Sequence, residues 1–262
     1  ASDVQRDSDW VLEGGDTEPA EVQRTQLLRE LLERYKNDYA QSWYQFLRGT
    51  GVRHAEGLHA ALQELSGLSD LQDSPLKAFM QAVNLNTRWD LPASAYVGPG
   101  GVDTEVVPPV AAHLLEIHDG SLAKRFEPVS QLFTIDGPEG SSSTIMDRYL
   151  GSLRLLKVRA SDILRSQNVG KSSKRLVNET LDGQPTEIAV VRQQVERYVD
   201  TSDRGVAVEL RRMFSAPVQN TWSALRQLTG LHVAGEWSQK IVQPWQKMVA
   251  HRYPLVAMAS NE

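Results

Sequence analysis

Apolar residues recur at spacings of three and four along most of this 262-residue chain, which is the period of an amphipathic helix. The longest run covers residues 21–47, with charged residues between the apolar ones. Within it, Tyr35, Tyr39 and Trp43 stand one helical turn apart and form a ladder of large rings. We expect this ladder to pack against a neighbouring element, because each ring can bury about 150 to 250 Å².

The remaining pattern is helical as well. Ser74-Pro75 combines an N-cap with a proline at the first helical position, which predicts a helix through Val83. Sustained period-two alternation bounded by hairpin turns is hard to find, and residues 165–184 are polar and ambiguous. The sequence therefore predicts an all-α fold, an irregular multi-helix bundle of elongated form. The other predicted helices cover residues 55–65, 144–164, 188–199, 207–214, 218–228 and 237–252, with interrupted helical patterning over residues 110–133.

Helix breakers divide the chain. Pro92, Gly98-Pro99-Gly100-Gly101 and Pro108-Pro109 crowd residues 90–109, which we interpret as a surface loop. This loop belongs to a predicted N-terminal helical subdomain, residues 1–133. A C-terminal helical subdomain follows over residues 143–255, and residues 256–262 begin a linker.

The last predicted helix carries the strongest boundary signal. Trp237 and Trp245 lie on it, and Pro254 ends it, because proline cannot donate a backbone hydrogen bond and pushes Tyr253 out of the helical region. We expect Trp237, Trp245, Tyr253 and Pro254 to be packing residues that fix how a further domain leaves the helical one. We therefore expect the chain to be one domain of a larger protein.

Composition excludes several classes of function. The chain has 28 basic and 33 acidic residues, and this net charge of −5 argues against nucleic acid as the main partner. It contains no cysteine, so disulfides, thiolate zinc sites and a cysteine nucleophile are excluded. No apolar run approaches the roughly 20 residues that cross a bilayer, so we expect no direct membrane insertion by this segment.

Familiar catalytic and binding motifs fail to match. The histidine pairs His54/His59 and His113/His118 have a spacing that rotates the two rings off a common helical face, and neither forms a zinc motif. Gly170-Lys171-Ser172 resembles the end of a phosphate loop, but Arg165 stands where the leading glycine should be. We expect no catalytic residue, no cofactor, no metal and no enzymatic activity.

Four segments in order carry a resemblance. They are Asp9-Trp10-Val11-Leu12, the pattern Tyr-x-x-x-Tyr-x-x-x-Trp-x-x-Phe-Leu over residues 35–47, Ser74-Pro75-Leu76-Lys77, and Trp237 with Arg252-Tyr253-Pro254. Together they resemble the helical periplasmic region of the TssM (IcmF-like) proteins of type VI secretion systems. One departure is Leu255, where members of that family usually carry phenylalanine.

The resemblance implies a role and partners. Such proteins are anchored in the inner membrane and extend a helical stalk and a β-rich domain across the periplasm. This chain would be the helical part, a scaffold that links the inner-membrane anchor to the lipoprotein-docking domain. The implied partners are other copies of the chain, the outer-membrane lipoprotein TssJ, mainly through the missing downstream domain, and the inner-membrane protein TssL.

Two other functions remain open on the residues alone. One is an independent helical adaptor or regulator that binds a partner peptide or helix in a groove. The other is an all-α enzyme such as a peptidoglycan lytic transglycosylase, which needs a catalytic glutamate in a sugar-binding cleft. The Glu-Ser pair of those enzymes is missing, and Glu179 followed by Thr180 is a poor substitute.

Overall fold

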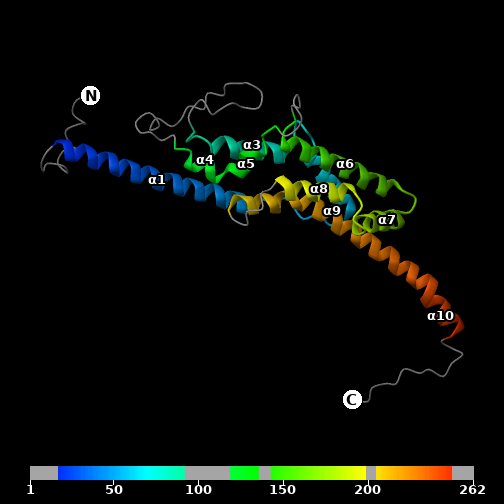
Figure 1. Cartoon of the computed structure of the whole chain (residues 1–262). Coiled ribbons are helices and arrows are strands. Elements are labelled where there is room, and N and C mark those ends of the chain that lie inside the picture. Colours follow the sequence, from blue (N-terminus) through cyan, green and yellow to red (C-terminus); the bar gives the residue numbers. More distant parts are fainter. Residues whose placement is uncertain (1–16, 92–118, 136–142, 199–204, 250–262) are drawn as a thin grey trace, which may run out of the picture. The chain divides into compact units, whose positions relative to one another are not determined.

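The structure is a computed structural model that describes residues 17–91, 119–135, 143–198 and 205–249 (Figure 1). Within these ranges every regular element is a helix, and the backbone pairing between Ile135 and Thr144 is an isolated bridge. The all-α prediction is confirmed. The helices are α1 (Thr17–Gly49), α2 (Gly57–Leu68), α3 (Pro75–Asn86), α4 (Ser121–Arg125), α5 (Glu127–Gln131), α6 (Ile145–Arg165), α7 (Val169–Leu181), α8 (Glu187–Tyr198), α9 (Val206–Trp237), the π-helical turn η4 (Ser238–Val242) and α10 (Gln243–Met248).

Several expectations fall outside the described ranges: nearly all of the surface loop 90–109, the boundary residues Tyr253 and Pro254, and the linker 256–262. The chain forms two compact units that interleave along the sequence. Unit 1 comprises residues 1–49 and 83–127, and unit 2 comprises residues 50–82 and 128–262. The consecutive division at residues 133 and 143 stays a prediction.

Unit 1 is built around α1, which contacts α4. The buried residues Lys36, Ala40 and Leu47 recur at helical spacing along one side of α1. Of these three, Leu47 belongs to the apolar stripe that the sequence predicts, whereas Lys36 falls among the charged positions. Leu122 and Phe126, in and just after α4, are also buried. By contrast, the preceding two turns of α1 expose their large apolar side chains, which are Leu27, Leu28 and Leu31.

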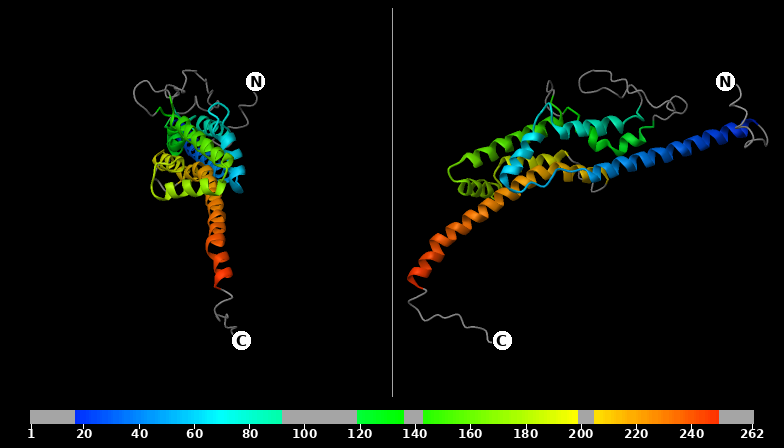
Figure 2. Two further views of the ribbon diagram at one scale, coloured as in Figure 1. Left: turned by 90° about the vertical axis from the view of Figure 1, so that its right-hand side faces the viewer. Right: turned by 180° about the vertical axis from the view of Figure 1, so that it is seen from behind.

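Unit 2 has α9 and α6 at its centre. Helix α9 packs against α2, α7 and α8, and α6 packs against α2, α7 and α8, as the two views of Figure 2 also show. Each buries one apolar stripe, which is how helices without a sheet form a common core. The buried side chains include Leu58, Ala61 and Leu65 of α2, Met146, Leu150, Leu153 and Leu156 of α6, and Leu210, Met213, Phe214 and Leu225 of α9.

Local capping explains where two of these helices begin. The Ser74 hydroxyl accepts a hydrogen bond from the Lys77 backbone N–H at 3.3 Å, and Pro75 opens α3. The predicted start of this helix is confirmed. Helix α6 begins with a capping box, in which Thr144 and Asp147 each accept a hydrogen bond from the other's backbone N–H.

The polar stretch over residues 165–184 is largely helical, a structure that its apolar periodicity alone left ambiguous. Helix α7 occupies residues 169–181 and buries only three residues, Ser173, Leu176 and Val177. The Asn168 side chain caps it by accepting from the Lys171 N–H at 2.8 Å. Because α7 buries so few residues, its hydrophobic pattern in the sequence is weak. Its packing against α9 stabilises it as a helix.

The predicted helix break between residues 214 and 218 is wrong, because α9 runs through Pro217 without ending. Proline inside a helix removes one hydrogen bond and costs about 3 kcal/mol. Here the residues on both sides of it, Phe214 and Val218, are almost fully buried. We attribute the continuity to this packing, which outweighs the local cost of the proline.

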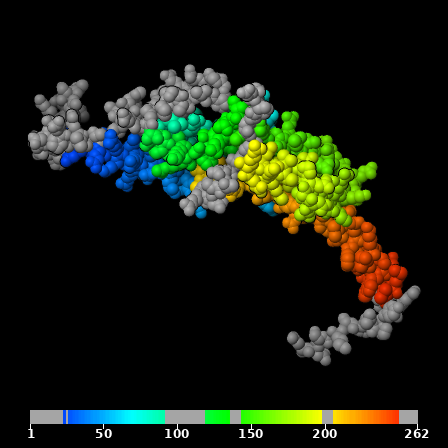
Figure 3. All heavy atoms as spheres, in the orientation of Figure 1, coloured from blue at the N-terminus to red at the C-terminus, as the bar shows by residue number. Residues whose placement is uncertain are grey.

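The last part of unit 2 is a helical segment without buried residues. No residue from Gly230 to Met248 is buried, although α9, η4 and α10 form a continuous helical run there. Figure 1 and Figure 3 show it extending away from the other helices of unit 2. We call residues 230–248 the C-terminal rod.

Candidate functional site

The predicted aromatic ladder lies in unit 1 and is completed by Trp89, a ring that the sequence pattern did not single out. Ring centroids are 5.9 Å apart for Tyr35 and Tyr39 and 6.4 Å apart for Tyr39 and Trp43. Trp89 lies 6.2 Å from Tyr35 and 6.1 Å from Tyr39. The Tyr39 hydroxyl donates to the Asn86 carbonyl at 2.9 Å. The ladder therefore meets the end of α3, although Tyr35 keeps half of its surface exposed.

Beside the ladder lies a partly buried polar cluster, which we call the Lys36 clamp: Lys36, Asp90, Asp119 and Ser121. The Lys36 ammonium is almost fully buried and donates to Asp119, to Asp90 at 3.4 Å and to Ser121 at 3.4 Å. It also sits 5.7 Å from the centre of the Trp89 ring. One lysine thus joins α1 to the residues before α4 and after α3.

Asp90 connects the clamp to the backbone. Its side chain is fully buried and accepts hydrogen bonds from the N–H groups of Leu122 at 2.7 Å and Ala123 at 3.1 Å. Its carbonyl accepts from the Gly120 N–H at 3.2 Å. The N-cap of helix α4 is Gly120, which has no side chain to cap the helix. Asp119 accepts from the Ser121 N–H at 2.9 Å, and Asp90, which is distant in the sequence, satisfies the next two donors.

Electrostatics favour the ionised form of Asp119. Burial raises the pKa of Asp119, but hydrogen bonds from Lys36 and Ser121 and the charge of Lys36 outweigh it, holding that pKa at about 2. A buried cation with two carboxylates is a strong structural restraint, because removing one partner leaves an uncompensated charge inside the protein. The clamp therefore joins segments of unit 1 that are far apart in the sequence.

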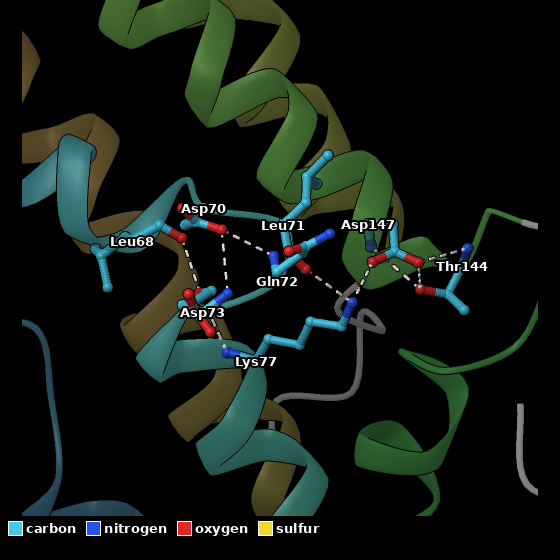
Figure 4. A network of polar contacts seen from close by, with 9 residues as sticks. Leu68, Asp70, Leu71, Gln72, Asp73, Lys77, Thr144 and Asp147 are labelled. Atoms are coloured by element: carbon cyan, nitrogen blue, oxygen red, sulfur yellow. Dashed lines mark hydrogen bonds and ion pairs between the residues drawn. The ribbon is translucent and has the colours of Figure 1, made fainter.

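The second polar network lies in unit 2, where the α2–α3 connection meets the start of α6 (Figure 4). The Lys77 ammonium donates to Asp147 at 2.7 Å and to the Leu71 carbonyl at 3.1 Å. Asp70 accepts from the N–H groups of Gln72 and Asp73, which shapes the connection. Because Asp147 belongs to the capping box of α6, this ion pair ties the start of α3 to the start of α6.

A cavity of about 420 Å³ opens among α2, α3, α9 and the segment that precedes α2. Its lining is mainly apolar and includes Leu68, Leu76, Phe79 and Met213. Glu64 is the one carboxylate in that lining. We call it the unit 2 cavity.

The Glu64 carboxylate is only half satisfied. One oxygen, Oε2, accepts from the Asn220 side-chain amide at 2.7 Å, and that amide also donates to the Arg53 carbonyl at 2.9 Å. The other oxygen, Oε1, is buried and has no hydrogen-bond partner among the residues that the structure describes. Burial raises the pKa of Glu64, while the Asn220 hydrogen bond and the charge of His54 act against that shift.

Between α7 and α9 lies a polar groove whose charges mostly satisfy one another. Lys174 pairs with Glu236 at 2.8 Å, and Arg175 pairs with Glu179 at 2.8 Å. Lys240 also contacts Glu236 at 2.9 Å. Glu179, the residue considered as a candidate catalytic glutamate, therefore serves a helix-surface ion pair in this structure.

The two predicted packing residues of the last helix are on the surface. Trp237 is 61% exposed and Trp245 is 53% exposed, on the C-terminal rod. A packing role for either residue stays a prediction, and within the described part of the chain nothing buries them.

The described ranges contain no group of three or more histidine, aspartate or glutamate side chains arranged to hold a metal ion. Within the same ranges, no helix is both long enough and apolar enough to cross a membrane.

Comparison with known proteins points to one family. The family model "IcmF-related: Intracellular multiplication and human macrophage-killing" matches residues 1–88, which contain the aromatic ladder and the Ser74-Pro75 start of α3. Residues 1–88 are therefore similar to the IcmF-related family. No curated protein matches it.

The fold of this chain is also found in solved structures. One, described as "Type VI secretion system membrane core complex", has a TM-score of 0.62 and 20% identity over 91% of this chain. Another, "Type VI membrane complex", has a TM-score of 0.58 and 18% identity over 89% of this chain. The present chain spans 44% and 43% of the length of those two chains.

Proposed function

We propose that this chain is a non-enzymatic scaffold segment of a type VI secretion system membrane complex. In this role it links an inner-membrane anchor to a periplasmic domain that docks an outer-membrane lipoprotein. The main support is the fold, which matches a chain of a type VI secretion system membrane core complex over 91% of this sequence. The IcmF-related match over residues 1–88 supports the same assignment independently.

The packing suits a part that transmits position and load. In unit 1 the Lys36 clamp fixes three segments by buried charge, and in unit 2 α6 and α9 share a close-packed apolar core. Restraints of this kind resist deformation, because displacing either segment would expose apolar surface or separate buried charges. The buried polar groups of the clamp serve to hold the fold.

The partners in this proposal are other copies of the chain, TssL at the inner membrane, and TssJ mainly through a downstream domain. The chain would lie in the periplasm as part of an inner-membrane-anchored protein. Repeated copies are expected, because assemblies of this kind are built by symmetry.

The linking role can be tested with the full-length protein in its native membrane. We would compare it with a version in which residues 17–249 are replaced by a flexible linker, and capture the complex through TssL. We expect the full-length protein to bring down TssJ and TssL together, whereas the linker version loses the joint complex. Joint capture by the linker version, at equal protein level, would rule out a linking role for this segment.

The lytic transglycosylase alternative needs a separate test. Purified chain is incubated with peptidoglycan, and soluble muropeptides are measured. We expect no turnover. Turnover that is lost on changing one glutamate, for instance Glu64→Gln or Glu179→Gln, would replace the scaffold proposal with an enzyme.

A further inference from the structure

The first half of α1 carries an apolar stripe on its outer side. Leu27, Leu28, Leu31 and Tyr35 fall within an arc of about 100° on the helix and are exposed by between 44% and 67%. The buried side of α1, marked by Ala40, is turned about 180° away from Leu31. Figure 1 shows this half of the helix continuing beyond α4, which α1 contacts within unit 1. A contiguous apolar stripe in water indicates an interaction surface.

Two opposite charges bracket the stripe at equal distances from its centre. Arg24 stands seven residues before Leu31 and Asp38 stands seven residues after it. Seven residues are close to two helical turns, so both charges share the side of Leu31 and lie about 10 Å from it along the helix axis. Both side chains are exposed, and neither forms an ion pair with another residue that the structure describes. The stripe therefore has a positive end and a negative end.

Such a stripe is complementary to itself when a second copy is turned end to end. With Leu31 of both copies at the two-fold axis, Arg24 of each copy faces Asp38 of the other. Leu27, four residues before the centre, then faces Tyr35, four residues after it. An antiparallel pair thus places each apolar side chain against an apolar one and each terminal charge against its opposite.

A parallel pair in the same register lacks this complementarity. It places three like charges against each other, at Arg24, at Arg34 and at Asp38, which disfavours that orientation. In the antiparallel pair, Arg34 of one copy instead lies beside Glu30 of the other, on the same flank of the contact. Exposed ion pairs add little affinity, so the charges select the orientation while burial of the apolar stripe supplies most of the affinity.

We propose that a second copy of the chain covers this stripe, in an antiparallel pair of α1 helices centred on Leu31 and flanked by two Arg24–Asp38 ion pairs. Both copies use the same surface, so the contact closes at two copies. It names how copies of the chain associate, and in this it rests on the proposed scaffold function. Two copies anchored in one membrane satisfy the symmetry when the two-fold axis runs along the membrane normal.

Charge reversal tests the orientation. Arg24→Asp and Asp38→Arg each convert both ion pairs of the homodimer into like-charge pairs. In a 1:1 mixture of the two variants, one copy carries only carboxylates at these positions and the other only cations, so both ion pairs form again. Arg29→Asp is the matched control, because it makes the same change of charge on α1 at a position about 160° away from Leu31.

Truncation tests the apolar contact. Leu31→Ala keeps a good helix former and removes the side chain at the centre of the stripe. Leu155→Ala is the matched control, because Leu155 lies on α6 and is 61% exposed, against 60% for Leu31.

Sedimentation velocity over a range of concentrations measures association of the 262-residue chain, with circular dichroism and thermal unfolding as checks on folding. We expect wild type and both controls to form dimers and nothing larger. Each charge reversal, and Leu31→Ala, should weaken dimerisation about tenfold. The 1:1 mixture of the two reversals should dimerise within about threefold of wild type. Restored association also shows that both reversed variants are folded.

Any one of four results would overturn the proposal. They are a wild-type chain that is monomeric at every concentration, a charge reversal or Leu31→Ala that dimerises as wild type does, a mixture that associates no better than its two components, and a control variant that weakens dimerisation as much as the test variants. A parallel pair gives the second of these results, because each reversal merely exchanges one like-charge pair for another.

Failure of this contact is distinguishable from failure of the scaffold function. Loss of self-association with joint capture of TssJ and TssL intact removes only the α1 pair. Loss of the linking role is decided by joint capture with the linker version, which measures partner binding and does not depend on association of the isolated chain.

Discussion

The Tyr149 hydroxyl donates a hydrogen bond to the Phe214 carbonyl at 2.7 Å, and the two rings lie with centroids 4.7 Å apart. Both side chains are almost fully buried, so this pair joins α6 to α9 in the middle of unit 2. Burial raises the pKa of Tyr149, which keeps the phenol protonated as a donor. Phe214 lies three residues before Pro217, which has no backbone N–H to donate within α9.

Removing this hydroxyl should destabilise unit 2 without opening a cavity of note. For Tyr149→Phe we expect a loss of about 1 kcal/mol in the free energy of unfolding, the usual contribution of one buried hydrogen bond. Urea unfolding followed by circular dichroism measures it. An unchanged midpoint would show that the hydroxyl contributes nothing to the α6–α9 contact.

The Lys36 clamp should be the most sensitive polar site in the chain. Lys36→Met keeps the aliphatic stem but leaves the buried Asp90 carboxylate without its cation, and we expect a loss of about 3 to 5 kcal/mol. Lys240→Met, which removes an exposed lysine from a surface pair, should change stability by less than about 1 kcal/mol. Both are measured by urea unfolding.

A double-mutant cycle shows whether the destabilisation by Lys36→Met arises from the unpaired charge of Asp90. Asp90→Asn in the Lys36→Met background removes that charge while keeping an oxygen for the N–H groups of α4. The double variant should therefore be more stable than Lys36→Met alone. If it is less stable, lost packing accounts for the destabilisation better than electrostatics does.

The lowered pKa of Asp119 predicts how folding stability changes at acidic pH. Its folded pKa of about 2 lies below the ordinary value of 3.8, so its ionised form favours the folded state. That contribution is fully present above about pH 4 and is lost as the pH falls towards 2. The stability difference between wild type and Asp119→Asn should shrink over this range.

Salt provides the control for that measurement. The Asp119 side chain is 55% exposed, so solvent screens its interaction with Lys36 and the difference should fall at high ionic strength. Equal stability differences at pH 5 and pH 2 would show that the carboxylate charge is not what stabilises the clamp.

The contact between α7 and α9 depends on a missing side chain. A Cβ built at Gly170 would lie 2.7 Å from the Cβ of His232, too close for the two helices to keep their separation. We expect Gly170→Ala to cost about 1 to 3 kcal/mol, as overpacking does. The matched change Gly151→Ala, in α6 with open space around the new methyl group, should stabilise by about 0.4 to 1 kcal/mol.

Thermal unfolding of the two glycine variants, measured side by side, tests whether the α7–α9 contact requires a glycine at residue 170. Opposite shifts in the unfolding temperature are expected. A stabilised Gly170→Ala variant would mean that α7 and α9 adjust their spacing freely.

The sequence predicts well the features that depend on local signals. The start of α3 follows from Ser74-Pro75, and the extent of α1 and α6 follows from long apolar stripes. The sequence pattern fails to predict features that depend on residues far apart in the chain. Lys36 falls among the charged positions of α1, yet Asp90 and Asp119 bury it, and no pattern in α1 indicates partners 54 and 83 residues away.

The aromatic residues show the same limit in two ways: the pattern misses one ring that packs, and it predicts packing for two rings that are exposed. Trp89 belongs to no periodic apolar pattern in the sequence, but its ring lies close to the rings of both Tyr35 and Tyr39. Trp237 and Trp245 have an ideal helical spacing, yet the described chain offers nothing to cover them. Periodicity identifies the apolar face of a helix, but which surface covers that face depends on tertiary or quaternary structure.

The hydrogen bond between the Gly120 N–H and the Asp90 carbonyl, at 3.2 Å, also closes a loop in the covalent chain. Closing a loop costs conformational entropy, which favourable contacts at its ends must offset. The Lys36 clamp, which includes Asp90, supplies such contacts and so helps to hold unit 1 together against this entropy.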